Sequence, residues 1–185
     1  MDLATNEKAQ DAANVMGQDS LTNELKNSTD SPVNNGYIDQ ILAIAARGWP
    51  VFPCGTDKRP LIATGFHVAS LDPVQIRTWW KVWPAALVAI PTGAVSGFDV
   101  LDVDVKNGQP GLASLAKLVE THGPLPTTLV AETRSGGFHY YFKHVEGARN
   151  SASKIAPGID VRADGGYVIA PPSLGYRWIG QGVQS

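Results

Sequence analysis

Aspartates at alternate positions mark the segment 98–105, which reads FDVLDVDV. In a strand, side chains two residues apart lie on one face at about 6 to 7 Å, so Asp102 and Asp104 are expected to point together. Two carboxylates in an otherwise apolar strand need a neutralising partner. A divalent cation would serve, and oxygen ligands suit Mg²⁺ or Mn²⁺ better than zinc. The alternative is an exposed strand face with solvated acids. Asp99 has the opposite parity and is left out of this candidate site.

A turn of small residues precedes an aromatic strand in the second segment, 133–142, which reads TRSGGFHYYF. Gly136 and the glycine after it let a ligand approach the backbone, and successive amides of such a turn can bind an anion. Arg134 and Ser135 add a cation and a hydroxyl donor. His139 is expected to point away from its flanking rings, where it could donate to a phosphate. The alternative is a structural, hydrogen-bonded histidine.

The third segment, 158–167, reads GIDVRADGGY and repeats the alternation of the first. Asp160 and Arg162 share a face of the expected strand. A carboxylate beside a guanidinium suits a triphosphate with its cation, because the base neutralises oxygens that the metal does not reach. The alternative is a pair that satisfies itself at the surface. The Asp164-Gly165-Gly166 sequence that follows predicts a hairpin turn.

Together the three segments favour nucleotidyl transfer with two metal ions. In that chemistry one cation lowers the pKa of a primer 3′-hydroxyl and the other holds the incoming triphosphate. A side-chain nucleophile is not required.

The composition sets the class of protein. The chain has 185 residues, 43% of them hydrophobic and 17% charged, which suits one globular domain. No apolar run approaches the roughly 18 residues of a spanning helix, and no signal-peptide order is present, so we expect a soluble, cytoplasmic protein without a membrane partner. The single cysteine, Cys54, excludes an internal disulfide and a multi-cysteine zinc site.

Charge is distributed unevenly along the chain. Residues 1–36 carry six acidic and two basic residues, and the remainder carries 11 acidic and 13 basic residues. The first 36 residues are polar and lack aromatic side chains, so we expect a disordered tail there. The remainder is slightly basic, which permits a polyanionic partner.

Hydrophobic periodicity and turn signals predict the elements that position these residues. A helix is expected from Tyr37 to Gly48, and Asp72-Pro73 begins a second helix whose tryptophans belong to the core. The spacing of apolar residues predicts a third helix over 111–122. Alternating apolar residues, bounded by glycine and proline, predict strands over 49–54, 86–90, 98–105, 128–133, 138–143, 158–162, 167–171 and 176–179. The interleaving indicates an α/β or α+β domain with a mixed sheet. Neither a GxxxxGK[ST] loop nor a GxGxxG turn is present.

The ordered motifs LDVD, SGGFHYYF and GIDVRADGGYVIAPPS resemble the primase-polymerase domain of the archaeo-eukaryotic primase superfamily, found at the N-terminus of phage and plasmid replication proteins. The likeness runs from about Tyr37 to Gly180 and implies a catalytic domain over 37–185. The implied fold has two α/β layers around a split active-site sheet, one of them like an RNA-recognition-type β-α-β unit.

The resemblance also implies roles for individual residues. It makes Asp102, Asp104 and Asp160 the ligands of two catalytic Mg²⁺ or Mn²⁺ ions. It gives Ser135, His139 and Arg162 contacts with the phosphates of the incoming nucleotide. Arg134 and Gly136 join this nucleotide-binding set from the analysis of the turn above. Lys58 and Arg59 are candidate nucleotide or template contacts.

Two departures from the family qualify this expectation. Some plasmid members carry a zinc-binding stem between the histidine and the third acid, but here only 20 residues separate His139 from Asp160 and none is cysteine. Because that stem is associated with initiation, primer extension is expected more than strand initiation. The chain also ends without a helicase segment, so we expect a fragment of a longer primase-helicase, or a helicase on a separate chain.

The leading hypothesis is a template-directed DNA primase/polymerase that uses dNTP or NTP, a primer and a single-stranded DNA template in phage or plasmid replication. One alternative is a catalytically weak single-stranded DNA or origin-binding module that recruits other replication proteins. Another is a metal-dependent hydrolase of nucleotides or phosphodiesters, which leaves the Gly-rich turn and His139 less well explained.

Overall fold

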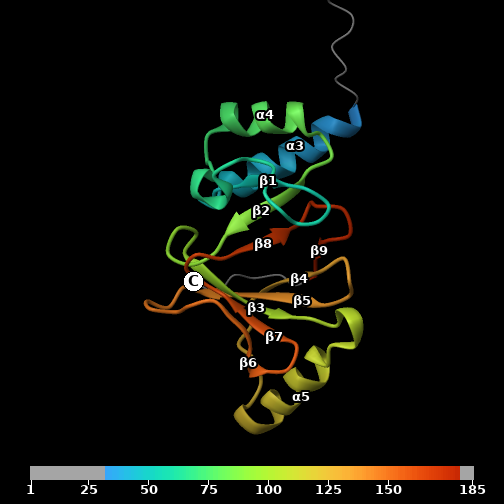
Figure 1. Cartoon of the computed structure of the whole chain (residues 1–185), viewed down its shortest axis with the longest axis vertical. Helices are drawn as coiled ribbons and strands as arrows, with labels where there is room; N and C mark the ends of the chain where they lie inside the picture. Colours follow the sequence, from blue (N-terminus) through green and yellow to red (C-terminus); the bar gives the residue numbers. More distant parts are fainter. Residues whose placement is uncertain (1–31, 180–185) are drawn as a thin grey trace, which may run out of the picture. The chain divides into compact units, whose positions relative to one another are not determined.

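The computed structural model describes residues 32–179 (Figure 1). The expected disordered tail, 1–36, lies outside the described residues except at its end, where helix α3 (Pro32–Ala45) has already begun. This helix starts five residues earlier than predicted. Proline is tolerated in the first turn of a helix, where its missing N–H has no partner in any case. Gly48, with φ of 83°, then turns the chain away from the helix as expected.

A three-stranded antiparallel sheet packs with two helices. Its strands, in the order β1-β2-β8, are β1 (Phe52–Cys54), β2 (Leu87–Pro91) and β8 (Tyr167–Ala170). Helix α4 (Pro73–Val82) begins where predicted, because the Asp72 side chain accepts the N–H of Val74 at 2.9 Å. Trp80 is buried against this sheet, and the expectation that the tryptophans serve the core is confirmed.

A six-stranded antiparallel sheet carries all three acidic or glycine-rich motifs. In spatial order its strands are β6 (Ser151–Ala156), β7 (Ile159–Arg162), β3 (Phe98–Val103), β5 (Phe138–Lys143), β4 (Leu129–Glu132) and β9 (Arg177–Trp178). The sequence analysis missed β6, which is exposed and lacks apolar alternation. The remaining short elements are 3-10 turns, η1 (Gly65–Val68) and η2 (Lys106–Gly108).

Helix α5 (Gly111–His122) covers one face of the larger sheet, beside β3, β6 and β7 (Figure 1). Since β3 and β4 both pair antiparallel with β5, the β3-α5-β4 connection is a crossover between strands separated by β5, as in a split β-α-β unit. Gly111 lets the helix start against the sheet, because a Cβ there would lie 2.7 Å from the Gly158 carbonyl oxygen. The combined α and β architecture expected from the sequence is confirmed, but the expected mixed sheet is not found, because all the named strands pair antiparallel.

The chain crosses between the two sheets three times, and the first two crossings, from β2 to β3 and from β7 to β8, are hydrogen-bonded to each other. We call this the inter-sheet joint, formed by Thr92, Ala94, Ala163, Asp164 and Gly166. The Thr92 N–H donates to the Gly166 oxygen at 3.0 Å, and the Thr92 hydroxyl donates to the Ala163 oxygen at 2.7 Å. The Asp164 carboxylate accepts the Ala94 N–H at 2.8 Å. The predicted Asp164-Gly165-Gly166 hairpin is therefore wrong: this turn joins β7 to β8, which belong to different sheets.

Asp99 lies on the face of β3 opposite to Asp102, as expected from its parity. It is buried, and its carboxylate contacts His144 Nδ1 at 2.9 Å and accepts the Val145 N–H at 3.0 Å. His144 Nε2 lies 3.8 Å from the Asp164 carboxylate. The Asp99–His144 pair therefore supports the inter-sheet joint and takes no part in the candidate site.

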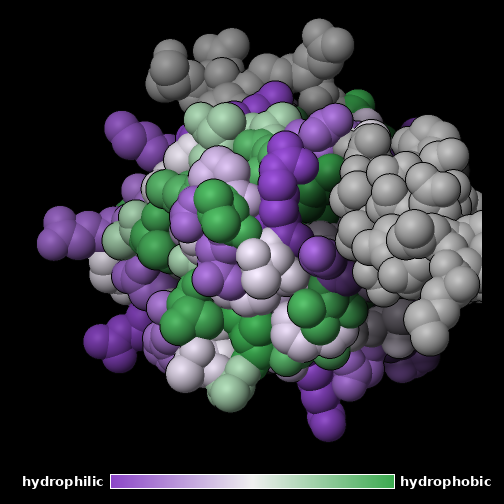
Figure 2. Space-filling view, turned by 90° about the horizontal axis from the view of Figure 1, so that it is seen from above, coloured by the Kyte–Doolittle hydropathy of each residue, from purple (hydrophilic) through white to green (hydrophobic). Residues whose placement is uncertain are grey.

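The surface at the helical end carries hydrophobic residues interspersed with hydrophilic ones (Figure 2). Val74 and Val82 of α4 are exposed beside charged neighbours. Scattered apolar side chains of this kind are usual on soluble surfaces. Among residues 32–179, no helix has the length and apolar character needed to cross a membrane.

We expect Thr92→Val to lower the free energy of unfolding by about 1 kcal/mol, because it removes a buried hydrogen bond to the Ala163 oxygen and leaves that oxygen with the Gly166 N–H as its donor. Thr78→Val is the matched control, since it also removes a hydroxyl bonded to a carbonyl oxygen but on an exposed helix face. The control should change stability by less than about 0.5 kcal/mol. Urea unfolding of the three proteins measures the difference, and equal losses would contradict the role of the joint.

His144 is expected to make stability depend on pH. Its hydrogen bond to Asp99 raises the pKa of His144, burial opposes the rise, and the charges of Asp99, Asp164 and Glu146 add to it. The protonated form is therefore favoured in the folded state, so this stabilisation is full below about pH 6.5 and is lost as pH rises through the raised folded pKa. Thermal unfolding of wild type and His144→Gln should differ most at acidic pH. A difference that grows towards alkaline pH would contradict the assignment.

Candidate functional site

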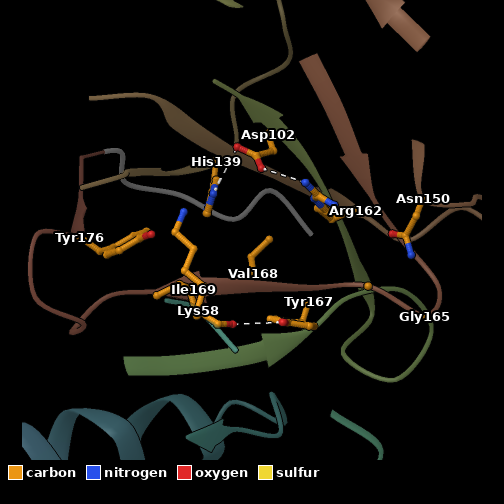
Figure 3. Close-up of a pocket in the computed structure, with 11 residues that line it drawn as sticks. Lys58, Asp102, His139, Asn150, Arg162, Gly165, Tyr167, Val168, Ile169 and Tyr176 are labelled. Atoms are coloured by element: carbon orange, nitrogen blue, oxygen red, sulfur yellow. Dashed lines mark hydrogen bonds and ion pairs between the residues drawn. The ribbon is translucent and has the colours of Figure 1, made fainter. Parts of the chain in front are cut away.

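A pocket of about 330 Å³ lies between β8 and the face of the larger sheet that bears Asp102 (Figure 3). Its volume is in the range of small-molecule sites. The lining combines one carboxylate, several cations and two tyrosines with apolar residues: Lys58, Asp102, His139, Asn150, Arg162, Gly165, Gly166, Tyr167, Val168, Ile169 and Tyr176.

Strand register places three of the predicted residues in one row. Asp102 of β3 is directly opposite His139 of β5 on one side and Asp160 of β7 on the other. Directly paired residues of an antiparallel sheet point to the same face, so all three side chains lie together. The expectation that His139 points away from its flanking rings is confirmed, because Phe138 and Tyr140 pack on the α5 side.

Arg162 lies between the two aspartates of this row. Its Nη2 is 2.7 Å from Asp160 Oδ2 and 3.7 Å from Asp102 Oδ2. The other Asp160 oxygen accepts the Ser153 N–H at 2.8 Å. The predicted shared face of Asp160 and Arg162 is confirmed, and both oxygens of Asp160 have partners.

Asp102 is held as a carboxylate by the cations around it. Burial, the largest influence, favours the neutral acid. The contact with His139, whose Nε2 lies 3.4 Å away, and the positive charges of His139, Arg162 and Lys58 outweigh it and lower the pKa of Asp102. The pocket therefore presents an ionised carboxylate among three basic side chains.

His139 is buried at the inner end of the pocket, with 5% of its surface exposed. Its Nε2 faces Asp102. Within the described part of the chain, its Nδ1 and the buried hydroxyl of Tyr176 have no hydrogen-bond partner. The two rings are neighbours, with centroids 6.2 Å apart. Because buried polar atoms without partners are uncommon, these two atoms suit a ligand or water at this end of the pocket.

Lys58 reaches the pocket from a tight loop. Its φ of 67° is unusual for a residue with a side chain. The conformation is held at both ends of the residue, because its N–H donates to the Gly55 oxygen at 2.9 Å and its own oxygen accepts from the Tyr167 hydroxyl at 3.1 Å. Arg59 leaves the loop in another direction: its side chain is 85% exposed and lies 3.8 Å from Asp57.

Five other predicted residues also lie outside the pocket lining: Asp160, described above, and four residues near one end of the larger sheet. Asp104 follows the end of β3, and its Oδ1 accepts the Lys106 N–H at 2.8 Å. Arg134, Ser135 and Gly136 are exposed in the turn before β5. A Cβ at Gly136 would lie 3.9 Å from a methyl group of Val105, so this turn and the segment after β3 are neighbours at one end of the sheet.

The donor chemistry of the aspartate pair fits a hard divalent cation. Two carboxylate oxygens approach one guanidinium nitrogen within 3.7 Å, so the fold already places a positive charge beside both. Within residues 32–179, no group of three or more His, Cys, Asp and Glu side chains gathers closely enough to hold a metal ion. Metal binding by the full set of Asp102, Asp104 and Asp160 stays a prediction.

Sequence reasoning missed the wall of the pocket contributed by the second sheet. Asn150 locks this wall, since its amide donates to the Asp164 oxygen and its carbonyl accepts the Ala163 N–H. Gly166 is required beside it, because a Cβ there would lie 2.9 Å from the Thr92 hydroxyl oxygen. The available signal was the DGGY sequence, whose paired glycines mark close backbone approach as well as a turn. Tyr176 carried no such signal.

Comparison with known proteins supports the resemblance seen in the motifs. Residues 41–184 match the model of the family described as bifunctional DNA primase/polymerase, N-terminal (Prim-Pol). A search of curated proteins gave no match. The family description implies DNA primase/polymerase activity, of the nucleotidyltransferase type, in general terms. Since the match covers most of the chain, this protein belongs to the bifunctional DNA primase/polymerase N-terminal family.

Proposed function

We propose that this domain is a template-directed DNA primase/polymerase that transfers nucleotides to a primer 3′-hydroxyl with the help of two divalent ions, Mg²⁺ or Mn²⁺. The observation that supports it best is the row formed by Asp102, Asp160 and His139, with Arg162 between the aspartates. Ionised carboxylates next to a basic pocket are what a metal-bound triphosphate requires.

Asp102 and Asp160 would hold the ions, together with Asp104 at the end of β3. When bound, divalent ions in such sites lower the pKa of the attacking hydroxyl and neutralise phosphate charge. Lys58 and His139 would bind and orient the phosphates from opposite sides of the pocket. Ser135 and Arg134 lie in the turn near the end of β3, where they would contact the phosphates or the primer.

The partners proposed for this site are dNTP or NTP, a primer and a single-stranded DNA template, with a replicative helicase as a domain or a separate chain. The described surface has no large excess of positive charge, so template binding should be salt-sensitive and modest. We place no zinc site in this domain, and the phage or plasmid setting remains part of the proposal.

We expect Asp102→Asn and Asp160→Asn each to reduce primer extension by about 10²-fold or more, because each removes a negative charge that would hold the divalent cation, and the cation in turn stabilises the reacting phosphate. Extension of a labelled primer on a single-stranded template, with four dNTPs and Mn²⁺, measures it. Asp39→Asn is the matched control, since Asp39 is exposed on α3 and pairs only loosely with Arg77 at 4.0 Å.

Circular dichroism of each variant separates lost chemistry from lost folding. Full activity in either site variant would overturn the assignment of the catalytic carboxylates. A folded wild type that binds single-stranded DNA but extends nothing would favour the recruitment module instead. A lane without primer tests strand initiation in the same experiment.

The two basic residues of the 57–60 loop should behave differently. Lys58→Ala is expected to raise the KM for dNTP roughly tenfold, equivalent to one lost charge-assisted contact. Arg59→Ala removes the same charge one residue away, but its side chain lies outside the pocket, so the KM for dNTP should stay near that of wild type. Steady-state extension of one template position measures both. Equal effects would show that only the general charge of the loop matters.

A further inference from the structure

We propose that Arg162 competes with a divalent cation for Asp102 and Asp160, and that metal binding releases its guanidinium to hold an anionic substrate group in the pocket. This inference rests on the proposed function, because it concerns the same carboxylates. It assigns Arg162 a second position and couples the two binding events.

The position of the guanidinium supports competition. Nη2 lies 2.7 Å from Asp160 Oδ2 and 3.7 Å from Asp102 Oδ2, so it is the positive group shared by the two carboxylates. A divalent cation that bridges these oxygens needs bonds of about 2.0 to 2.6 Å to them. That cation would occupy the space of the guanidinium and repel its charge. Both cannot hold the same pair of oxygens.

Asp160 is anchored so that only one of its oxygens needs to change partner. Its Oδ1 accepts the N–H of Ser153, which has φ of 49° at an irregularity in the pairing of β6 with β7. This bond comes from the backbone and is independent of Arg162. Oδ2 is therefore the exchangeable oxygen, and the carboxylate can trade a guanidinium for a metal ion without leaving its place.

The Arg162 side chain has room to move away from the two carboxylates and into the pocket. Its side chain is 36% exposed, in contrast to the buried His139, and it lines the pocket together with Lys58 (Figure 3). A guanidinium released from Asp160 would be a forked donor facing that pocket, which suits a phosphate oxygen pair. Cation and anion would then each favour the other, as reciprocal linkage requires.

The test is a titration of the whole chain with Mn²⁺ in the absence of nucleotide. Binding is measured by calorimetry or from the electron paramagnetic resonance signal of free Mn²⁺. Arg162→Gln is expected to bind Mn²⁺ about five- to tenfold more tightly than wild type, because the competing charge is gone. With Mn²⁺ present, the same variant should bind dNTP more weakly. Arg177→Gln is the matched control, since Arg177 pairs with Glu132 elsewhere on the sheet.

One outcome would overturn this inference and leave the proposed function standing: Mn²⁺ binding to the wild type depends on Asp102, but Arg162→Gln binds Mn²⁺ no more tightly than the wild type. Mn²⁺ binding that Asp102→Asn does not weaken would instead remove the metal site of the proposed function. If Arg162→Gln does not fold, ¹⁵N resonances of the wild-type Arg162 guanidinium decide: they should shift as Mg²⁺ is added, and their constancy at saturation would overturn the inference.

Discussion

An ionised carboxylate in the middle of a largely buried strand is the constraint on which the site depends. Asp102 has only 22% of its side chain exposed, and a buried carboxylate is costly unless charged groups and hydrogen bonds compensate it. The two strands that flank β3 supply the compensation, His139 from β5 and Arg162 from β7. Both strands must be in register with β3 for this to work, because a slip of one residue would turn His139 or Arg162 to the α5 side.

The same constraint explains why the second sheet matters. The larger sheet alone would leave Asp102 and His139 open on a flat face. The inter-sheet joint brings β8 and the Lys58 loop opposite that face and so makes a pocket. The inter-sheet joint is tightly packed. Gly166 has no room for a side chain, and both the nitrogen and the oxygen of the Asn150 amide are hydrogen-bonded to the backbone of the joint. Electrostatic influence on Asp102 reaches across the pocket from Lys58, so the two sheets are coupled by charge as well as by hydrogen bonds.

Alternation within single strands could be predicted from the sequence, and it placed Asp102, His139, Asp160 and Arg162 on the correct faces. Pairing between strands could not, because register is fixed by contacts distant in the chain. Asp104 shows the limit of parity: it was predicted to extend the strand, but β3 ends at Val103 and the carboxylate caps the following turn. The Asp164-Gly165-Gly166 sequence correctly indicated a turn, yet no local signal tells whether a turn joins strands of one sheet or of two. The sequence alone could not tell that Lys58, and not Arg59, enters the pocket. Lys58 is directed there by its left-handed backbone conformation, which a hydrogen bond from the Tyr167 hydroxyl, on another strand, stabilises.

The balance of charges in the pocket determines which ligands the site can attract. Asp102 and Asp160 carry two negative charges, Arg162 neutralises one of them, and Lys58 adds a second positive charge to the pocket lining. If divalent cations bind these carboxylates as proposed, the local charge would change from nearly neutral to strongly positive, and only where the metal is bound. A triphosphate would then be attracted to the metal-loaded site more than to the metal-free protein. This local change would make a strongly basic surface unnecessary, which agrees with the small excess of basic residues outside the first 36.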